Sequence, residues 1–91
     1  MKISRILQVP TVRILLYLLE KGQVRHSELA KIIASRGTLS LSLKELEEEG
    51  LVRRRIVDSK PIRSFYSLTP RGAEIAKYLD KIEKLYSKGA I

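Results

Sequence analysis

Basic side chains gather at two places in this sequence, in patterns that suit binding to phosphate groups. Arg36 and Lys44 lie in an amphipathic helical segment, and a later arm carries five basic residues against the single acid Asp58. Arginine and lysine bind backbone phosphates, and arginine also forms paired hydrogen bonds with guanine edges. A run of arginines alone is more often a solvated face, but the two groups together predict a duplex-binding surface.

The amphipathic segment runs from about residue 36 to residue 49, and Leu39, Leu43 and Leu46 mark its buried stripe. Ser35 precedes it as a predicted N-cap. Four glutamates crowd its end and would repel phosphates, so only the N-terminal part is expected to enter a major groove. The residues predicted to contact DNA from this helix are Ser35, Arg36, Gly37, Thr38, Ser40, Leu41 and Lys44.

Two of these residues have alternative explanations. Leu41 points outward, and it either contacts a thymine methyl group or is half covered by the neighbouring helix. Gly37 lowers helix stability by about 0.5–1 kcal/mol relative to alanine, so its presence needs a reason. Close approach to a sugar-phosphate backbone is one reason, and tight packing against the preceding helix is the other.

The basic arm is predicted to be a hairpin. Gly50 ends the helix, and an extended run, a turn at 58–61 and a second extended run follow. If Val52 and Ile56 face the core, strand alternation turns Arg54 inward in part as well, and Arg54 is then a candidate to pair with a glutamate of the helix. The residues predicted to contact DNA from this wing are Arg53, Arg55, Ser59, Lys60 and Arg63, with Lys60 and Arg63 ranked above Arg54.

Other segments supply the body that positions these two groups. Pro10 suits the first turn of a helix over 11–21, and apolar residues cover more than half of its circumference, so this helix is expected at the centre of the core. A short third strand over 23–25 and a second helix over 26–34 follow. The second helix is expected to bury Leu29, Ala30, Ile32 and Ile33.

Thr69 and Pro70 are the start signals of a last helix that extends to about Lys88. Its apolar residues are four, three and four positions apart, which is the 3.5-residue period of a coiled-coil seam. This seam is predicted to join two copies of the chain, with the Ile3–Leu7 segment as a second candidate. The predicted dimerisation residues are Ile75, Leu79, Ile82 and Tyr86.

Together these elements predict an α+β, mostly helical fold. It is a winged helix-turn-helix with a three-helix core, a two- or three-stranded β wing and a C-terminal dimerisation helix. One domain is expected over 1–91, with core and wing over 11–68 and the coiled-coil-like helix over 69–88.

The net charge of +8 and the pI near 10.1 indicate which chemical class of partner the chain attracts. They favour a polyanion, either nucleic acid or anionic lipid, or else describe a merely basic soluble surface. No apolar run approaches the roughly 20 residues of a membrane helix, so a cytoplasmic protein with no membrane partner is expected. The chain lacks asparagine and is rich in lysine, arginine and glutamate, which leans towards a heat-adapted source.

Catalytic and metal-binding patterns find no support in the sequence. The chain has no cysteine, which excludes disulfides and thiolate metal sites. The single histidine, His26, has no cluster of acids around it, and we expect it near the DNA backbone or simply exposed. No cofactor and no metal are therefore expected, and an enzyme is not indicated.

The run from Leu39 to Val52 resembles the recognition helix of winged-helix regulators of the MarR and ArsR type. The sequence is most similar to the HxlR-like family, in which tyrosine, any residue, Leu-Thr and then a glycine precede the last helix. Here this motif spans Tyr66 to Gly72, with Pro61 at the wing turn.

The resemblance covers roughly residues 12–76 and implies a homodimeric transcriptional regulator that reads a two-fold symmetric operator. It implies that 36–44 enters the major groove and that the wing lies on the backbone. The chain departs from the family in lacking an N-terminal cysteine, so thiol sensing is not implied. An architectural DNA-binding protein of low specificity, or a winged-helix protein-interaction module centred on Leu41, are the alternatives.

Overall fold

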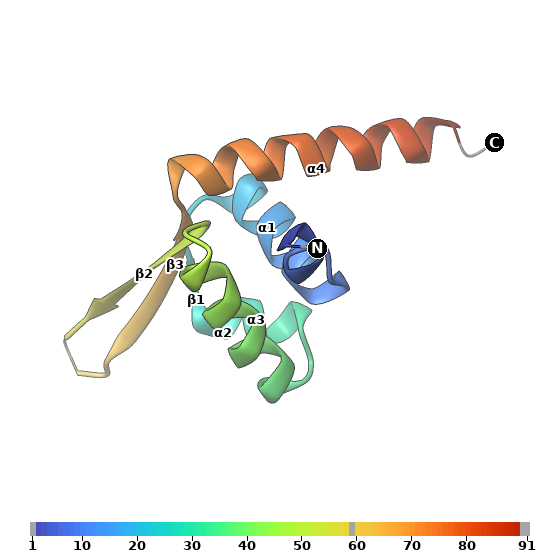
Figure 1. Ribbon diagram of the computed structural model, residues 1–91. Coiled ribbons are helices and arrows are strands. Elements are labelled where there is room, and N and C mark those ends of the chain that lie inside the picture. The colour runs from blue at the N-terminus through green and yellow to red at the C-terminus, as the bar shows by residue number, and fades with distance from the viewer. Residues whose placement is uncertain (1, 59, 90–91) are drawn as a thin grey trace.

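The fold is α+β, as predicted, and combines helices with a three-stranded antiparallel sheet (Figure 1). The computed structural model describes residues 2–58 and 60–89. In chain order the elements are η1 (Lys2–Arg5, a 3-10 helix), α1 (Val9–Lys21), β1 (Val24–Arg25), α2 (His26–Ile32), α3 (Arg36–Glu48), β2 (Val52–Val57), β3 (Arg63–Leu68) and α4 (Pro70–Gly89).

Helix α1 lies at the centre of the molecule, which its nearly all-round apolar pattern predicted. It begins at Val9, two residues before the predicted start, and Pro10 lies in its first turn, where the missing N–H costs no helical hydrogen bond. Ile14, Leu15 and Leu18 are at most 1% exposed. Helices α3 and α4 and strand β3 pack around α1, so it holds the other elements in place.

The strands have the order β1–β3–β2, with both pairings antiparallel. Val52 pairs with Leu68 at the base of the β2–β3 hairpin, and Val57 pairs with Arg63 near its tip. Val52 is 3% exposed, whereas Ile56 is 54% exposed. The prediction that Ile56 faces the core is therefore wrong, because the hairpin extends past the helices before it reaches this residue (Figure 1).

Two glycines form the turns that follow helices. Gly22 follows α1 with a φ of 83°, and Gly50 follows α3 with a φ of 73°, a region that favours a residue without Cβ. Helix α2 is shorter than predicted and ends at Ile32, because the next residue has extended backbone torsions. Ala30 is exposed, so its predicted burial is wrong; this seven-residue helix turns only a narrow side, carried by Leu29, to the core.

The N-terminal part of helix α4 packs on α1, and the C-terminal end of α4 extends beyond the body of the molecule (Figure 1). Gly72 and Ala76 are buried on the side that faces the core. Thr69 is the predicted cap, since its Oγ1 accepts a hydrogen bond from the N–H of Gly72 at 3.0 Å. Among the described residues, no helix combines the length and the apolar character needed to cross a membrane.

Candidate nucleic-acid interface

The N-terminal half of α3 presents the predicted contact residues to solvent. Ser35 caps the helix, with its Oγ accepting a hydrogen bond from the N–H of Thr38 at 3.3 Å. The buried stripe of Leu39, Leu43 and Leu46 turns the opposite side to the core. The exposed residues of this half are Ser35, Arg36, Gly37, Thr38, Ser40, Leu41 and Lys44.

The structure bears on the alternatives for two of these residues. Leu41 is 58% exposed, so it is partly covered and still presents apolar surface to solvent. A Cβ added to Gly37 would meet no other atom within 4 Å, which excludes tight packing against the preceding helix. Both residues are therefore accessible from outside the chain.

The C-terminal end of α3 is tied to the rest of the chain by ion pairs. The guanidinium group of Arg5 bonds Glu48 at 2.5 Å and Glu49 at 3.2 Å, and Arg54 lies 3.8 Å from Glu47. The pairing of Arg54 with a glutamate was predicted from strand alternation. The contribution of Arg5 was missed, because nothing in the local sequence places η1 beside the end of α3.

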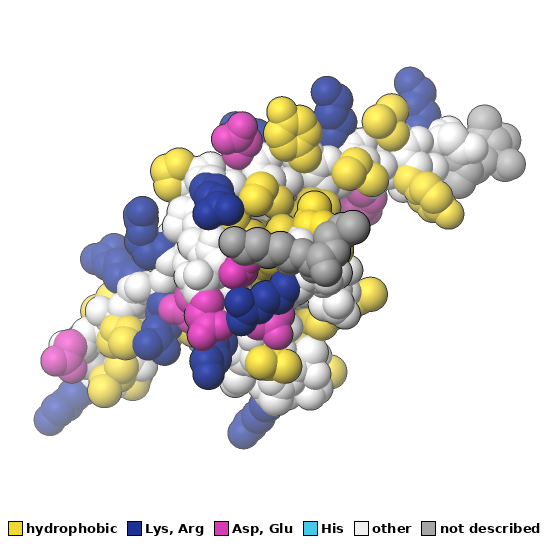
Figure 2. Space-filling model, viewed as in Figure 1, with side chains coloured by type: hydrophobic (Ala, Val, Ile, Leu, Met, Phe, Trp, Pro, Cys, Tyr) yellow, Lys and Arg dark blue, Asp and Glu magenta, His cyan; other side chains and the backbone are white. Residues whose placement is uncertain are grey.

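The tip of the hairpin carries the wing residues that ranked highest in the sequence. Lys60 and Arg63 are both exposed there. Ser59, which was also predicted to contact DNA, lies outside the described residues. Figure 2 shows lysine and arginine side chains along the hairpin, so the arm is basic over its length.

The three arginines of β2 lie on two different faces of the hairpin. Arg53 and Arg55 share the face on which Phe65 lies, and the guanidinium carbon of Arg25 is 5.9 Å from the Phe65 ring centroid. Arg54 lies on the opposite face, toward α3, as its pairing with Glu47 shows. The predicted wing contacts Arg53 and Arg55 are therefore directed away from the recognition helix.

The N-terminal end of α3 and the tip of the hairpin lie on the same side of the body, opposite α4 (Figure 1). No element of the described chain stands between them and solvent on that side in this view. A single duplex can therefore meet both features at once, which is the geometry that a recognition helix and a wing require.

The predicted dimerisation residues do not form one exposed seam. Ile75 and Leu79 are half-buried against the core of their own chain, whereas Ile82 is 62% exposed and Tyr86 is 80% exposed. Tyr78, which was expected to flank the seam, and Leu85, which was not predicted, are also exposed and share a helical face with Ile82 and Tyr86. The exposed apolar stripe of α4 consists of Tyr78, Ile82, Leu85 and Tyr86.

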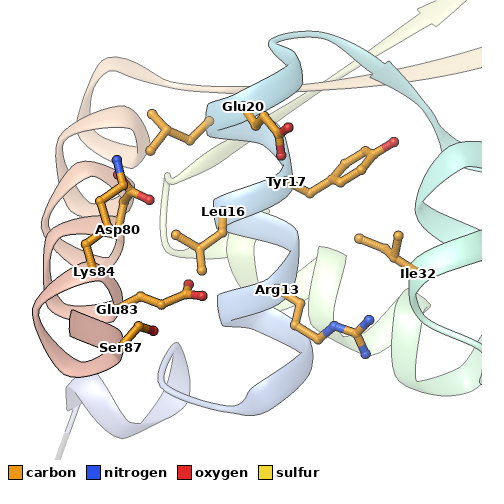
Figure 3. Close-up of a pocket in the computed structure, with 10 residues that line it drawn as sticks. Arg13, Leu16, Tyr17, Glu20, Ile32, Asp80, Glu83, Lys84 and Ser87 are labelled. Atoms are coloured by element: carbon orange, nitrogen blue, oxygen red, sulfur yellow. The ribbon is translucent and has the colours of Figure 1, made fainter. Parts of the chain in front are cut away.

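An open groove of about 830 Å³ lies between α1 and the diverging part of α4 (Figure 3). Arg13 and Glu20 of α1 and Asp80, Glu83 and Lys84 of α4 place charges of both signs along it. Leu16, Tyr17, Leu19 and Ile32 add apolar side chains to its lining. Among the described residues, no group of histidines and acids is arranged to hold a metal ion.

A helix pair α2–α3 with a solvent-facing second helix, followed by a basic hairpin, defines the winged helix-turn-helix class. The chain belongs to the HxlR-like helix-turn-helix family, whose model matches residues 11–90. It is thus a helix-turn-helix transcriptional regulator by class.

Two bacterial relatives carry the name of uncharacterized HTH-type transcriptional regulators. YvaP of Bacillus subtilis (strain 168) is 39% identical over 75 residues, which are 80% of this chain and 69% of that protein. The protein sll1512 of Synechocystis sp. is 41% identical over 69 residues, which are 74% of this chain. The chain spans only about half of the latter relative, 51% of its length.

Solved structures have the same fold. A transcriptional regulator homologue from Pyrococcus horikoshii OT3 superposes with a TM-score of 0.77 at 28% identity, over 94% of this chain and 88% of that one. The redox regulator HypR in its oxidized form gives a TM-score of 0.86 over 99% of this chain and 94% of its own. Its identity is 22%, so the likeness to HypR concerns the fold alone.

Proposed function

We propose that this chain is a homodimeric regulator that binds double-stranded DNA in a sequence-specific way. The N-terminal half of α3, from Arg36 to Lys44, enters the major groove. The basic hairpin lies on the backbone and at the minor groove. The observation that carries this proposal is that both features face the same side of the body (Figure 1).

The charge distribution supports this orientation. The N-terminal half of α3 carries Arg36 and Lys44 and no acid. The glutamates lie toward the far end, where Glu48 and Glu49 pair with Arg5 and Glu47 pairs with Arg54. The hairpin tip adds Lys60 and further basic side chains. Phosphates are therefore attracted at the two places where contact is proposed.

The exposed stripe of α4 supports a homodimer. Tyr78, Ile82, Leu85 and Tyr86 are each more than 60% exposed, and contiguous apolar surface of this kind marks interaction sites. A two-fold dimer places two recognition helices about 34–36 Å apart, one turn of B-DNA. Both half-sites of a palindrome can then be read at once.

Selection of bound sequences from random duplexes, followed by footprinting, tests the function. A regulator enriches a palindrome whose half-sites are one helical turn apart. Equal affinity for all duplexes would instead assign the chain to the architectural DNA-binding proteins. Absence of binding to any duplex would exclude both and leave the protein-interaction module that the exposed Leu41 permits.

A salt titration and two sets of variants test the proposed roles. If about six phosphates are neutralised, log K should fall with log salt at a slope near −5. Charge reversal at Lys60 and Arg63 should weaken binding to every duplex alike, whereas changing Arg36 or Ser40 should alter sequence preference.

Light scattering on a sizing column tests the dimer. Ile82→Ser should shift the chain to monomer and weaken binding to the selected palindrome. Lys77→Ser, on an exposed and polar part of the same helix, is the matched control and should leave the dimer intact. A dimer that survives Ile82→Ser would contradict the assignment of this stripe.

A further inference from the structure

A polar notch of about 570 Å³ lies between α3 and the face of the hairpin that is turned toward it. The notch has one acid among the side chains that line it, and most of the others are hydrogen-bond donors. The lining residues are His26, Ser40, Leu43, Lys44, Glu47, Arg54, Ser64 and Tyr66.

The position of the notch identifies what would occupy it. In B-DNA one sugar-phosphate backbone separates each major groove from the neighbouring minor groove. A duplex with α3 in its major groove and the hairpin at its minor groove must therefore carry that backbone across the space between the two elements. Lys44, Arg54 and the hydroxyls of Ser40 and Ser64 line this space, and such groups bind phosphate oxygens.

Glu47 is unexpected in a phosphate site, because its carboxylate repels a phosphate. Its Oε1 lies 3.8 Å from Nε of Arg54, and both side chains remain partly exposed, at 32% and 47%. Burial raises the pKa of the Tyr66 hydroxyl, and a hydrogen bond with Arg54 opposes this effect in part. Arg54 thus has two internal partners, of which only Glu47 carries a charge.

Resting on the DNA-binding function proposed above, we infer that this notch binds one backbone phosphate and that Glu47 competes with that phosphate for Arg54. On binding, the guanidinium group exchanges the carboxylate for the phosphate. The charge of Glu47 stays behind, close to the backbone, and repels it. Glu47 therefore lowers affinity for every duplex, and the contacts of α3 in the major groove must overcome this repulsion.

Arg54 then contacts DNA, although strand alternation had ranked it below Lys60 and Arg63 as a DNA contact. A hairpin at the minor groove lies between two backbones. The face with Arg54 and Ser64 meets the backbone that adjoins α3, and the face with Arg53 and Arg55 is directed to the other one. The division of arginines between the two faces then matches two separate strands.

Fluorescence anisotropy with the selected palindrome and with an unrelated duplex tests the inference. Glu47→Gln should tighten binding to both duplexes by about three- to tenfold at low salt, since one charge near a phosphate is removed. Its salt slope should steepen by about 1, because in the wild-type chain the Glu47 carboxylate that Arg54 leaves takes up a cation and offsets one of the cations released from the DNA. Arg54→Gln should weaken binding to both duplexes alike, and in the Glu47→Gln background it should make the slope shallower by about 1.

The double variant isolates the competition. Loss of Arg54 should cost more affinity in the Glu47→Gln background than in the wild-type chain. Glu83→Gln, which makes the same charge change on α4, is the control and should stay within about twofold of the wild type. Thermal melts verify that each variant is folded.

Two outcomes would overturn the inference in different ways. If the wild-type chain binds no duplex, the proposed function fails and the notch with it. If the wild-type chain binds DNA but Glu47→Gln matches Glu83→Gln, or Arg54→Gln has no effect, then DNA binding stands and the notch assignment is wrong.

Discussion

Replacing Gly72 by alanine should strongly destabilise the protein, although alanine is the better helix former. Gly72 is buried in the first turn of α4. A Cβ at this position would lie 1.8 Å from the carbonyl oxygen of Leu51, 2.7 Å from its carbonyl carbon and 3.0 Å from its Cα. These are backbone atoms, and the same carbonyl oxygen accepts a hydrogen bond from the N–H of Thr69 at 3.1 Å, so a side-chain rotation cannot relieve the clash.

Two opposing effects determine the size of the change. Alanine in place of glycine stabilises a helix by about 0.5–1 kcal/mol. Overpacking a core costs typically about 1–3 kcal/mol, and contact between two backbone segments puts Gly72→Ala at or above the upper end. Displacing α4 also weakens the Thr69 hydrogen bond, by about 0.5–1.5 kcal/mol. The net loss should be about 2.5–4 kcal/mol, which lowers the melting temperature of a domain of this size by roughly 10–30 °C.

Circular dichroism at the helix band, with thermal and urea melts, measures this loss. Gly37→Ala in α3 is the matched control, since its Cβ would meet nothing within 4 Å. The control should melt at or slightly above the wild-type temperature, by at most about 1 kcal/mol of added stability. A Gly72→Ala protein that melts within about 2 °C of the wild type would refute the packing argument.

Three further predictions concern side-chain hydroxyl groups. Thr11→Val should cost about 1–3 kcal/mol in urea melts, because the hydroxyl is buried, donates to the Ile6 carbonyl at 2.7 Å and accepts from the Gln8 N–H at 3.1 Å. Thr69→Val should cost about 1 kcal/mol in the same assay, since it removes the cap of α4. Because burial raises the pKa of Tyr66, the unfolded chain loses that proton first above about pH 10, so the free energy of unfolding should fall there as pH rises. Urea melts below and above that pH measure this change, and the free energy of unfolding should fall less with pH in the Tyr66→Phe variant than in the wild type.

The sequence was sufficient for the order of the elements and for most of their ends. Side-chain periodicity identified α1 as the central helix, and the cap Ser35 and the turn at Gly50 bounded α3. These signals are local, since capping atoms and special torsions belong to residues a few positions apart. The C-terminal end of the short helix α2 was harder to predict, because apolar residues continue to Ile33 after the helix has ended.

Periodicity could not show where neighbouring elements end. The residues from Ile75 to Tyr86 share a helical face by spacing, yet α1 covers the first part of that face and leaves the rest exposed. Ile56 shares a strand face with the buried Val52, yet no helix reaches it. Both errors have the same physical origin: burial depends on the extent of the packing partner, which lies far away in sequence.

If DNA binds as proposed, the ion pairs at the end of α3 matter more for the electrostatics of binding than for stability. Arg5, with its side chain 42% exposed, and Glu48, at 49%, are too open to solvent for their contact to add much stability. Their positions matter more, because uncompensated glutamates one to two turns beyond Lys44 would repel the phosphates that the first half of the helix attracts. Arg5 cancels part of that charge from outside the helix, at a point away from the hairpin. With a basic start and an acidic end that is partly compensated, the helix would meet the proposed polyanion with its N-terminus first, so the arrangement of charge would favour that direction of approach before any base is contacted.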